Sequence, residues 1–287
     1  MIQARVAGVS LHLHGGDPDF FPRRFREYEA QIEKPDISMK RSRVPEITLA
    51  LGQEIVRRNG LLLIRSDDGY LHRYVRGSKS GKLLHECCTS PDYTQWEYTL
   101  LESRNHPTLS LTDFEYVYSG EAFSNRLASL GGLVMHGSAI AFDGKGIVFS
   151  APSGTGKSTH AGLWKQYYGE RVVHINDDKP ALRFDGGTPE IYGTPWSGKT
   201  DINRNIFAPL HAIVFLQQAP ENRLTPLSVP DAMMHIHRET VRPFYDEALS
   251  MKVLETTEKL ISSVPVFLLE CTISRDAVEL VKTAMHW

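Results

Sequence analysis

The chain contains little cysteine and no long apolar run. Only 3 of its 287 residues are cysteines, and two of these, Cys87 and Cys88, are adjacent. Such a set does not provide a disulfide framework, so we expect a cytoplasmic protein in a reducing compartment. No stretch approaches the roughly 20 apolar residues of a membrane span, and the N-terminus lacks the apolar core of a signal peptide.

A positive charge excess is also missing. The formal net charge is −2, which provides no electrostatic footprint for a nucleic-acid partner. Hydrophobic residues make up 41% of the chain and charged residues 23%, as is usual for a globular protein. A chain of 287 residues is long enough for one large domain or two modest ones.

The clearest chemical signal is a phosphate loop at residues 151–158, which reads Ala-Pro-Ser-Gly-Thr-Gly-Lys-Ser. Its glycines allow backbone N–H groups to surround phosphate oxygens, Lys157 can reach the β- and γ-phosphates, and the Ser158 hydroxyl can bind Mg²⁺. Ala151 stands where this motif commonly has glycine. The predicted ATP-binding residues are Ser153, Gly154, Thr155, Gly156, Lys157, Ser158 and Thr159.

The sequence around the loop has the context that the motif requires. A β-branched run at 146–150 predicts a strand before the loop, and apolar spacing over 157–168 predicts a helix after it. The turn pair Asp143-Gly144 predicts a hairpin between strands at 133–142 and 145–150. This strand pair differs from the parallel entry of most phosphate-loop proteins. Trp164 and Trp196 could stack on a nucleotide base, with core packing as the alternative.

A second chemical signal follows the loop helix. The apolar strand predicted over 171–176 ends at Asp177 and Asp178, where carboxylates can serve Mg²⁺ or accept a proton. The segment 193–199, Gly-Thr-Pro-Trp-Ser-Gly-Lys, is of a kind that approaches ligands. The alternatives are a solvated strand end for the aspartates and a core position for His136.

The pattern predicts an α/β (α+β) protein in three parts. Residues 1–110 form a small β-rich module with a hairpin over 61–76 and loops at 20–24 and 34–45. Residues 111–132 form a connecting helix, and residues 133–287 form the phosphate-loop domain, with a mixed sheet.

His136-Gly137-Ser138, the phosphate loop, Asp177-Asp178 and the segment 193–199 occur in an order that resembles the catalytic domain of the HPr kinase/phosphorylase family. Kinases of lasso-peptide precursors are among the relatives, and phosphoenolpyruvate carboxykinases resemble it more distantly. The resemblance covers about half the chain, from residue 133 onward. It implies an HPr-kinase-like domain that uses ATP and Mg²⁺ as an ATP-dependent serine kinase.

The resemblance also implies roles for individual residues. Lys157 would bind the β- and γ-phosphates, Ser158 and Asp178 would serve Mg²⁺, and Asp177 would deprotonate the accepting hydroxyl. His136 would lie against that aspartate and tune it. Thr159 replaces the glutamate that follows the loop in HPr kinases, and 194–205 replaces their arginine-rich signature.

Further expectations concern charge, assembly and the acceptor. Lys199 or Arg204 would stabilise the transferring phosphoryl group, with a surface role as the alternative for Arg204. Relatives often assemble, so we expect a homo-oligomer. The predicted function is transfer of the γ-phosphoryl group of ATP to a serine-type hydroxyl on a peptide or small protein. The alternatives are a kinase of a small hydroxyl metabolite such as free serine, a non-catalytic ATP sensor, and a carboxykinase-like enzyme, which would need a basic cluster and a second metal site.

Overall fold

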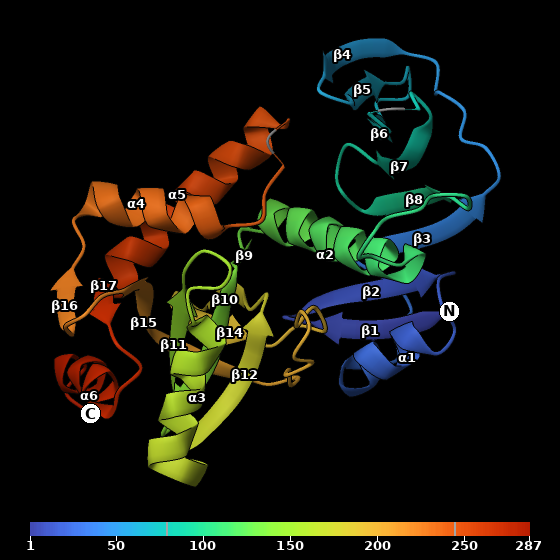
Figure 1. Cartoon of the computed structure of the whole chain (residues 1–287). Helices are drawn as coiled ribbons and strands as arrows, with labels where there is room; N and C mark the ends of the chain where they lie inside the picture. The colour runs from blue at the N-terminus through green and yellow to red at the C-terminus, as the bar shows by residue number, and fades with distance from the viewer. Residues whose placement is uncertain (79, 244) are drawn as a thin grey trace. The chain divides into compact units, whose positions relative to one another are not determined.

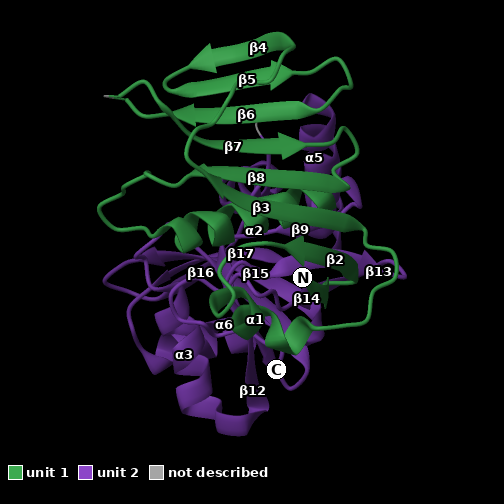
Figure 2. Ribbon diagram, turned by 90° about the vertical axis from the view of Figure 1, so that its right-hand side faces the viewer, with its two compact units in different colours: residues 1–126 green, residues 127–287 purple. Residues whose placement is uncertain are grey.

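The computed structural model describes residues 1–78, 80–243 and 245–287, which form two compact units (Figure 1). Unit 1 spans Met1–Arg126 and unit 2 spans Leu127–Trp287 (Figure 2). The helix predicted over 111–132 is α2, Leu111–Ser129, so the division between the units falls inside it. Within the described ranges, no helix is long and apolar enough to cross a membrane.

Unit 1 is built on one eight-stranded sheet in the order β1-β2-β3-β8-β7-β6-β5-β4. The predicted hairpin over 61–76 is confirmed, because β5 and β6 pair antiparallel. The strands of this sheet are β1 (Ile2–Val6), β2 (Val9–His14), β3 (Ile37–Val44), β4 (Gln53–Arg58), β5 (Leu61–Arg65), β6 (Leu71–Arg76), β7 (Leu83–Thr89) and β8 (Gln95–Leu101). The remaining elements of unit 1 are α1 (Phe20–Phe25), the 3-10 turn η1 (Arg26–Tyr28) and most of α2.

Two segments of unit 1 predicted as loops are regular elements, so those predictions are wrong. Residues 20–24 belong to α1, which buries Phe21 and Phe25 one turn apart. Residues 37–44 of the second segment form β3, which pairs parallel to both β2 and β8. Ile37 and Met39 alternate into the core, and this burial outweighs the polar character of the segment.

Unit 2 contains a nine-stranded mixed sheet, which confirms the predicted fold class. Its path is β12-β10-β11-β15-β14-β13-β9, with β17 beside β15 and β16 beside β17. The pairs β11·β15 and β15·β17 are parallel, whereas β10·β11 and β10·β12 are antiparallel. The strands are β9 (Leu133–Val134), β10 (Gly137–Phe142), β11 (Lys145–Ser150), β12 (Val172–Asp178), β13 (Ala181–Asp185), β14 (Thr188–Tyr192), β15 (Phe207–Gln218), β16 (Arg223–Pro226) and β17 (Val266–Cys271).

Helices complete unit 2, and one of them follows the phosphate loop directly. Its helical elements are α3 (Lys157–Tyr168), the 3-10 turn η2 (Gly169–Arg171), α4 (Val229–Glu239), α5 (Glu247–Ser263) and α6 (Arg275–Ala284). The predicted hairpin at Asp143-Gly144 is confirmed, and β11 leads straight into the loop. Trp164 on α3 is fully buried against Phe142 and Phe149, and Trp196 is also buried. Both tryptophans are therefore packing residues.

Candidate phosphate-binding and acid–base site

The phosphate loop lies between β11 and α3, as its motif predicts. Gly154 has a φ of +82°, and Gly156, the residue before α3, has a φ of +111°. A Cβ at either position would meet no atom within 4 Å, so these glycines are required by backbone conformation and not by crowding. Ser153, Ser158 and Thr159 are exposed around the helix N-terminus. This end of a helix presents free N–H groups and a partial positive charge to an anion.

Lys157 is folded onto the loop. Its Nζ donates hydrogen bonds to the backbone oxygens of Ala151 at 2.8 Å and Pro152 at 3.3 Å. Burial lowers the pKa of this amine, although the carboxylates of Glu239 and Asp178 act in the opposite direction. The loop thus holds a buried amine whose present partners are neutral oxygens, and a phosphate group would be a stronger partner.

Ser158 and Asp177 form the first polar pair of the site. The Ser158 hydroxyl donates to Oδ1 of Asp177 at 2.8 Å. Ser158 is in the first turn of α3. Asp177 is the second-last residue of β12 and is buried. A hydroxyl and a carboxylate side by side are oxygen ligands of the kind that Mg²⁺ prefers.

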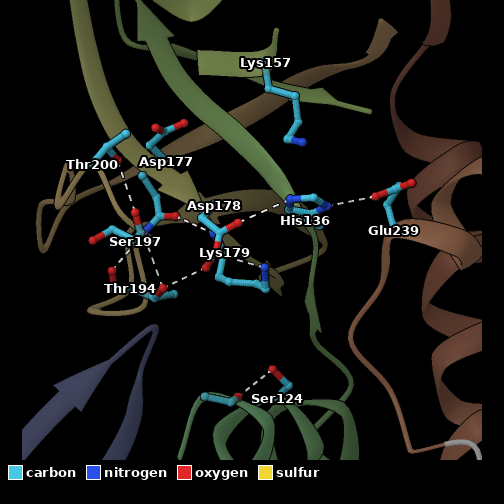
Figure 3. Close-up of polar contacts among 12 residues, drawn as sticks. Ser124, His136, Lys157, Asp177, Asp178, Lys179, Thr194, Ser197, Thr200 and Glu239 are labelled. Atoms are coloured by element: carbon cyan, nitrogen blue, oxygen red, sulfur yellow. Dashed lines mark hydrogen bonds and ion pairs between the residues drawn. The ribbon is translucent and has the colours of Figure 1, made fainter. Parts of the chain in front are cut away.

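His136 lies between two carboxylates from distant parts of the chain (Figure 3). Its Nε2 is 3.3 Å from Oδ1 of Asp178, and its Nδ1 is 3.1 Å from Oε2 of Glu239 at the end of α4. Nζ of Lys179 is 3.0 Å from Oδ2 of Asp178. Burial acts to raise the pKa of Asp178, but the hydrogen bond from His136 and the charge of Lys179 outweigh it and lower this pKa.

The contacts pair these residues differently from the sequence-based expectation. Ser158 was expected to share Mg²⁺ with Asp178, and His136 was expected beside the base Asp177; each instead contacts the other aspartate. At the end of β12 the two side chains take different partners, and Asp178, with a φ of +126°, departs from the extended backbone of a strand. In the β10 register Asp177 is opposite Ser138 and Asp178 is opposite Gly137.

The segment after β14 reaches the aspartates through its backbone. Asp177 N–H donates to the carbonyl of Ile202 at 2.9 Å. Gly198 packs on Asp178, since a Cβ at Gly198 would be 3.0 Å from the Asp178 Cβ. The side chains of Lys199 and Arg204 are exposed, and among the described residues no ion pair joins either one to an aspartate.

Two cavities border the phosphate loop. One, of about 510 Å³, is lined by loop residues, by the end of β15 and by His235, Arg238 and Glu239 of α4. The other, of about 440 Å³, lies along the first turns of α3 and the chain after β17. Within the described ranges, no three His, Cys, Asp or Glu side chains gather as a metal site.

Sequence reasoning missed Lys179, Arg238 and Glu239. Lys179 directly follows the predicted aspartate pair, so adjacency was an available signal. Glu239 is 103 positions from His136, and no local pattern marks it or Arg238. Only the placement of α4 next to the phosphate loop brings these two side chains to the site.

Comparisons with known proteins give two matches. The family model described as SynChlorMet cassette protein ScmC matches residues 118–285, which is more than half of the chain. Among solved structures, the Hpr(Ser) kinase/phosphatase from Coxiella burnetii is similar at 12% sequence identity, covering 53% of this chain and 88% of its own, with a TM-score of 0.31. No curated protein matches the chain.

Proposed function

The chain belongs to the family of SynChlorMet cassette protein ScmC, and we propose that it is an ATP-dependent kinase that transfers the γ-phosphoryl group to a hydroxyl. The observation that carries this proposal is the arrangement beside the phosphate loop. A hydroxyl–carboxylate pair, Ser158 and Asp177, adjoins a second carboxylate, Asp178, that is held by His136. Ser158 and Asp177 are suited to binding a metal ion, and Asp178 with His136 is suited to accepting a proton.

Nucleotide binding would use the loop and the start of α3. The N–H groups at residues 153–159 would surround the phosphates, and Lys157 would exchange its two carbonyl partners for phosphate oxygens. Ser158 and Asp177 fit Mg²⁺ and would hold it. When bound, Mg²⁺ neutralises charge on the β- and γ-phosphates.

The transfer step assigns the proton to Asp178. The acceptor oxygen forms a bond to the γ-phosphorus, the bond from that phosphorus to the bridging oxygen breaks, and ADP leaves with the electron pair. Asp178 takes the hydroxyl proton, since its side chain is an ionised carboxylate at neutral pH, with a pKa below the usual value for aspartate. His136, fixed by Glu239, holds the carboxylate in position. We therefore propose the reverse of the roles that the resemblance implied for Asp177 and Asp178.

Arg238 is the candidate for stabilising charge on the transferring group. It lines the same cavity as loop residues 151–155 and is next to Glu239. Cations near the γ-phosphate stabilise the charge that develops in transfer. We propose Arg238 for this role in preference to Lys199 and Arg204, because Arg238 is among the described residues that line this cavity and the other two are not.

The proposed acceptor is a serine-type hydroxyl on a peptide or small protein. A carboxylate base is useful only when the nucleophile carries a proton, which argues against a carboxylate or phosphate acceptor. The same argument disfavours a pure ATP sensor, which would need Lys157 and a metal site but no base. Unit 1 as the module that positions the acceptor, and free serine as a smaller acceptor, stay predictions, as does a homo-oligomer.

The test separates binding from transfer. Calorimetry with ATP and Mg²⁺ should show binding by the wild type and by Lys165→Ala, a control farther along α3, but none by Lys157→Ala. Candidate serine peptides and free serine are then incubated with ATP and Mg²⁺, and products are mapped by fragmentation mass spectrometry. If Lys157→Ala bound ATP as tightly as the wild type, the proposed phosphate site would be wrong. A product that carries phosphate on a carboxyl group would contradict the proposed hydroxyl acceptor.

A further inference from the structure

The two cavities beside the phosphate loop differ in charge. Both include Gly154, Thr155, Gln217 and Gln218. The larger contains Arg238 and Glu239, whereas no Asp, Glu, Lys or Arg is among the described residues that line the smaller. The histidine that lines the smaller cavity, His160, is buried, and its Nε2 accepts a hydrogen bond from the indole N–H of Trp164 at 3.4 Å. One side of the loop therefore suits charged chemistry and the other a neutral group.

The wall of the smaller cavity offers apolar surface at two places. Leu163 extends from α3, and Ile273 follows β17. The Ile273 side chain is 77% exposed, although an isoleucine gains free energy from leaving water. An apolar side chain at the rim of a cavity is a suitable surface for a flat, neutral ring. The side-chain amides of Gln217 and Gln218 offer donors and acceptors at the same edge.

The chain that carries Ile273 is held in place by hydrogen bonds. Asn222 accepts from the N–H of Thr272 at 2.8 Å and donates to the hydroxyl of Ser274 at 3.0 Å. Thr272 and Ser274 also bond to each other at 2.9 Å, and Ser274 caps α6. Both neighbours of Ile273 are thus fixed, so its place on the rim is set before any ligand arrives.

We propose that the smaller cavity binds the base and ribose of the nucleotide, while the larger receives the γ-phosphoryl group and the acceptor. This inference rests on the proposed function. The phosphates would lie across Gly154 and Thr155, the phosphate-loop residues that line both cavities, so the nucleotide would pass from the neutral side of the loop to the charged side. The nucleoside then adds affinity through contacts that the triphosphate alone does not make.

The experiment compares ATP with inorganic tripolyphosphate, both with Mg²⁺, by calorimetry. Ile273→Gln should weaken ATP binding by about 10-fold, roughly the effect of one apolar contact, and leave tripolyphosphate binding unchanged. Ala219→Trp, which fills the cavity, should have the same selective effect. Met251→Gln is the matched control, because Met251 is an exposed apolar residue on α5 outside both cavities.

The outcomes distinguish the two proposals. If tripolyphosphate binds and Lys157→Ala abolishes its binding, the phosphate site stands. If ATP then binds the wild type no more tightly than tripolyphosphate, or if both cavity variants bind ATP normally, the nucleoside inference is overturned alone. Tripolyphosphate binding that is indifferent to Lys157→Ala would overturn the proposed function, and this inference with it. Parallel titrations with GTP measure how strongly the cavity selects the base.

Discussion

The hydroxyl of Ser158 and Oδ1 of Asp177 are 2.8 Å apart, although 19 positions separate the two residues in the chain. This contact joins the first turn of α3 to the end of β12 and leaves Asp178 to His136. The two neighbouring aspartates consequently have separate environments, which is the physical basis for giving them separate tasks.

The first prediction concerns these two carboxylates. Asp178→Asn should keep ATP·Mg²⁺ affinity and lower the transfer rate by roughly 10²–10⁴-fold, because it removes the group that accepts the proton. Asp177→Asn should weaken Mg²⁺-dependent binding, which calorimetry with and without Mg²⁺ measures. The opposite pattern, with Asp177→Asn binding normally but not transferring, would restore the roles that the resemblance implied.

The second prediction concerns Glu239, which holds His136 through Nδ1 at 3.1 Å. Glu239→Gln should lower the transfer rate by about 10- to 100-fold, the usual effect of losing an outer partner. ATP affinity should stay unchanged, and the pH–rate profile should shift because the carboxylate charge beside His136 is gone. Glu258→Gln on α5 is an exposed control. A lower rate with an unaltered pH profile would reduce Glu239 to a structural role.

The third prediction uses two glycines with similar backbone conformation. Gly198 has a φ of +64° and Gly186 a φ of +53°, so alanine at either position should cost about 1 kcal/mol of stability. A Cβ at Gly198 would be 3.2 Å from Cγ of Asp178, whereas one at Gly186 would meet nothing within 4 Å. Only Gly198→Ala should reduce transfer, by about 10-fold or more. Equal transfer by both variants would show that Asp178 tolerates displacement.

The fourth prediction compares three cations. Arg238→Ala should lower the transfer rate by at least about 10-fold, since cations at transferring phosphoryl groups contribute up to 10³ or more. Lys199→Ala and Arg204→Ala should stay near the wild-type rate because neither is among the described residues that line the cavity beside the phosphate loop. Single-turnover rates with saturating ATP and Mg²⁺ measure the difference. Loss of transfer in either of the latter two, with Arg238→Ala active, would reverse the assignment.

The fifth prediction concerns stability in acid. Burial, together with the charges of Arg104 and Arg73, lowers the pKa of His85 in unit 1 to about 3. As the pH falls, His85 therefore takes up a proton in the unfolded chain before it does so in the folded chain. The stability that comes from burying the neutral ring is present above about pH 6.5 and is lost as the pH falls toward 3.

His85 alone should make the free energy of unfolding on the order of 2 kcal/mol lower at pH 5 than at pH 7. Urea unfolding at the two pH values measures this difference. His85→Phe should remove most of it, whatever its effect on stability at pH 7, whereas His286→Asn at an exposed position should not. An unchanged pH dependence in His85→Phe would show that other groups cause the acid sensitivity.

Local patterns in the sequence predicted the framework of unit 2. The Asp143-Gly144 turn, the strand before the phosphate loop and the helix after it were predicted correctly. Each is encoded within a few residues: two turn residues with positive φ, a β-branched run, and glycines before a helical apolar pattern. In unit 1, α1 and β3 were missed because their stability comes from burial against strands elsewhere in the chain.

The sequence by itself determined the phosphate loop, the strand that ends in two aspartates, and the residue types that the chemistry needs. It did not determine which aspartate meets Ser158 and which meets His136, because that choice depends on the face of β12 that each side chain takes in the finished sheet. Glu239 and Arg238 reach the site only because α4 packs beside the loop. Contacts between residues about a hundred positions apart carry no local signal, so only the tertiary structure decides them.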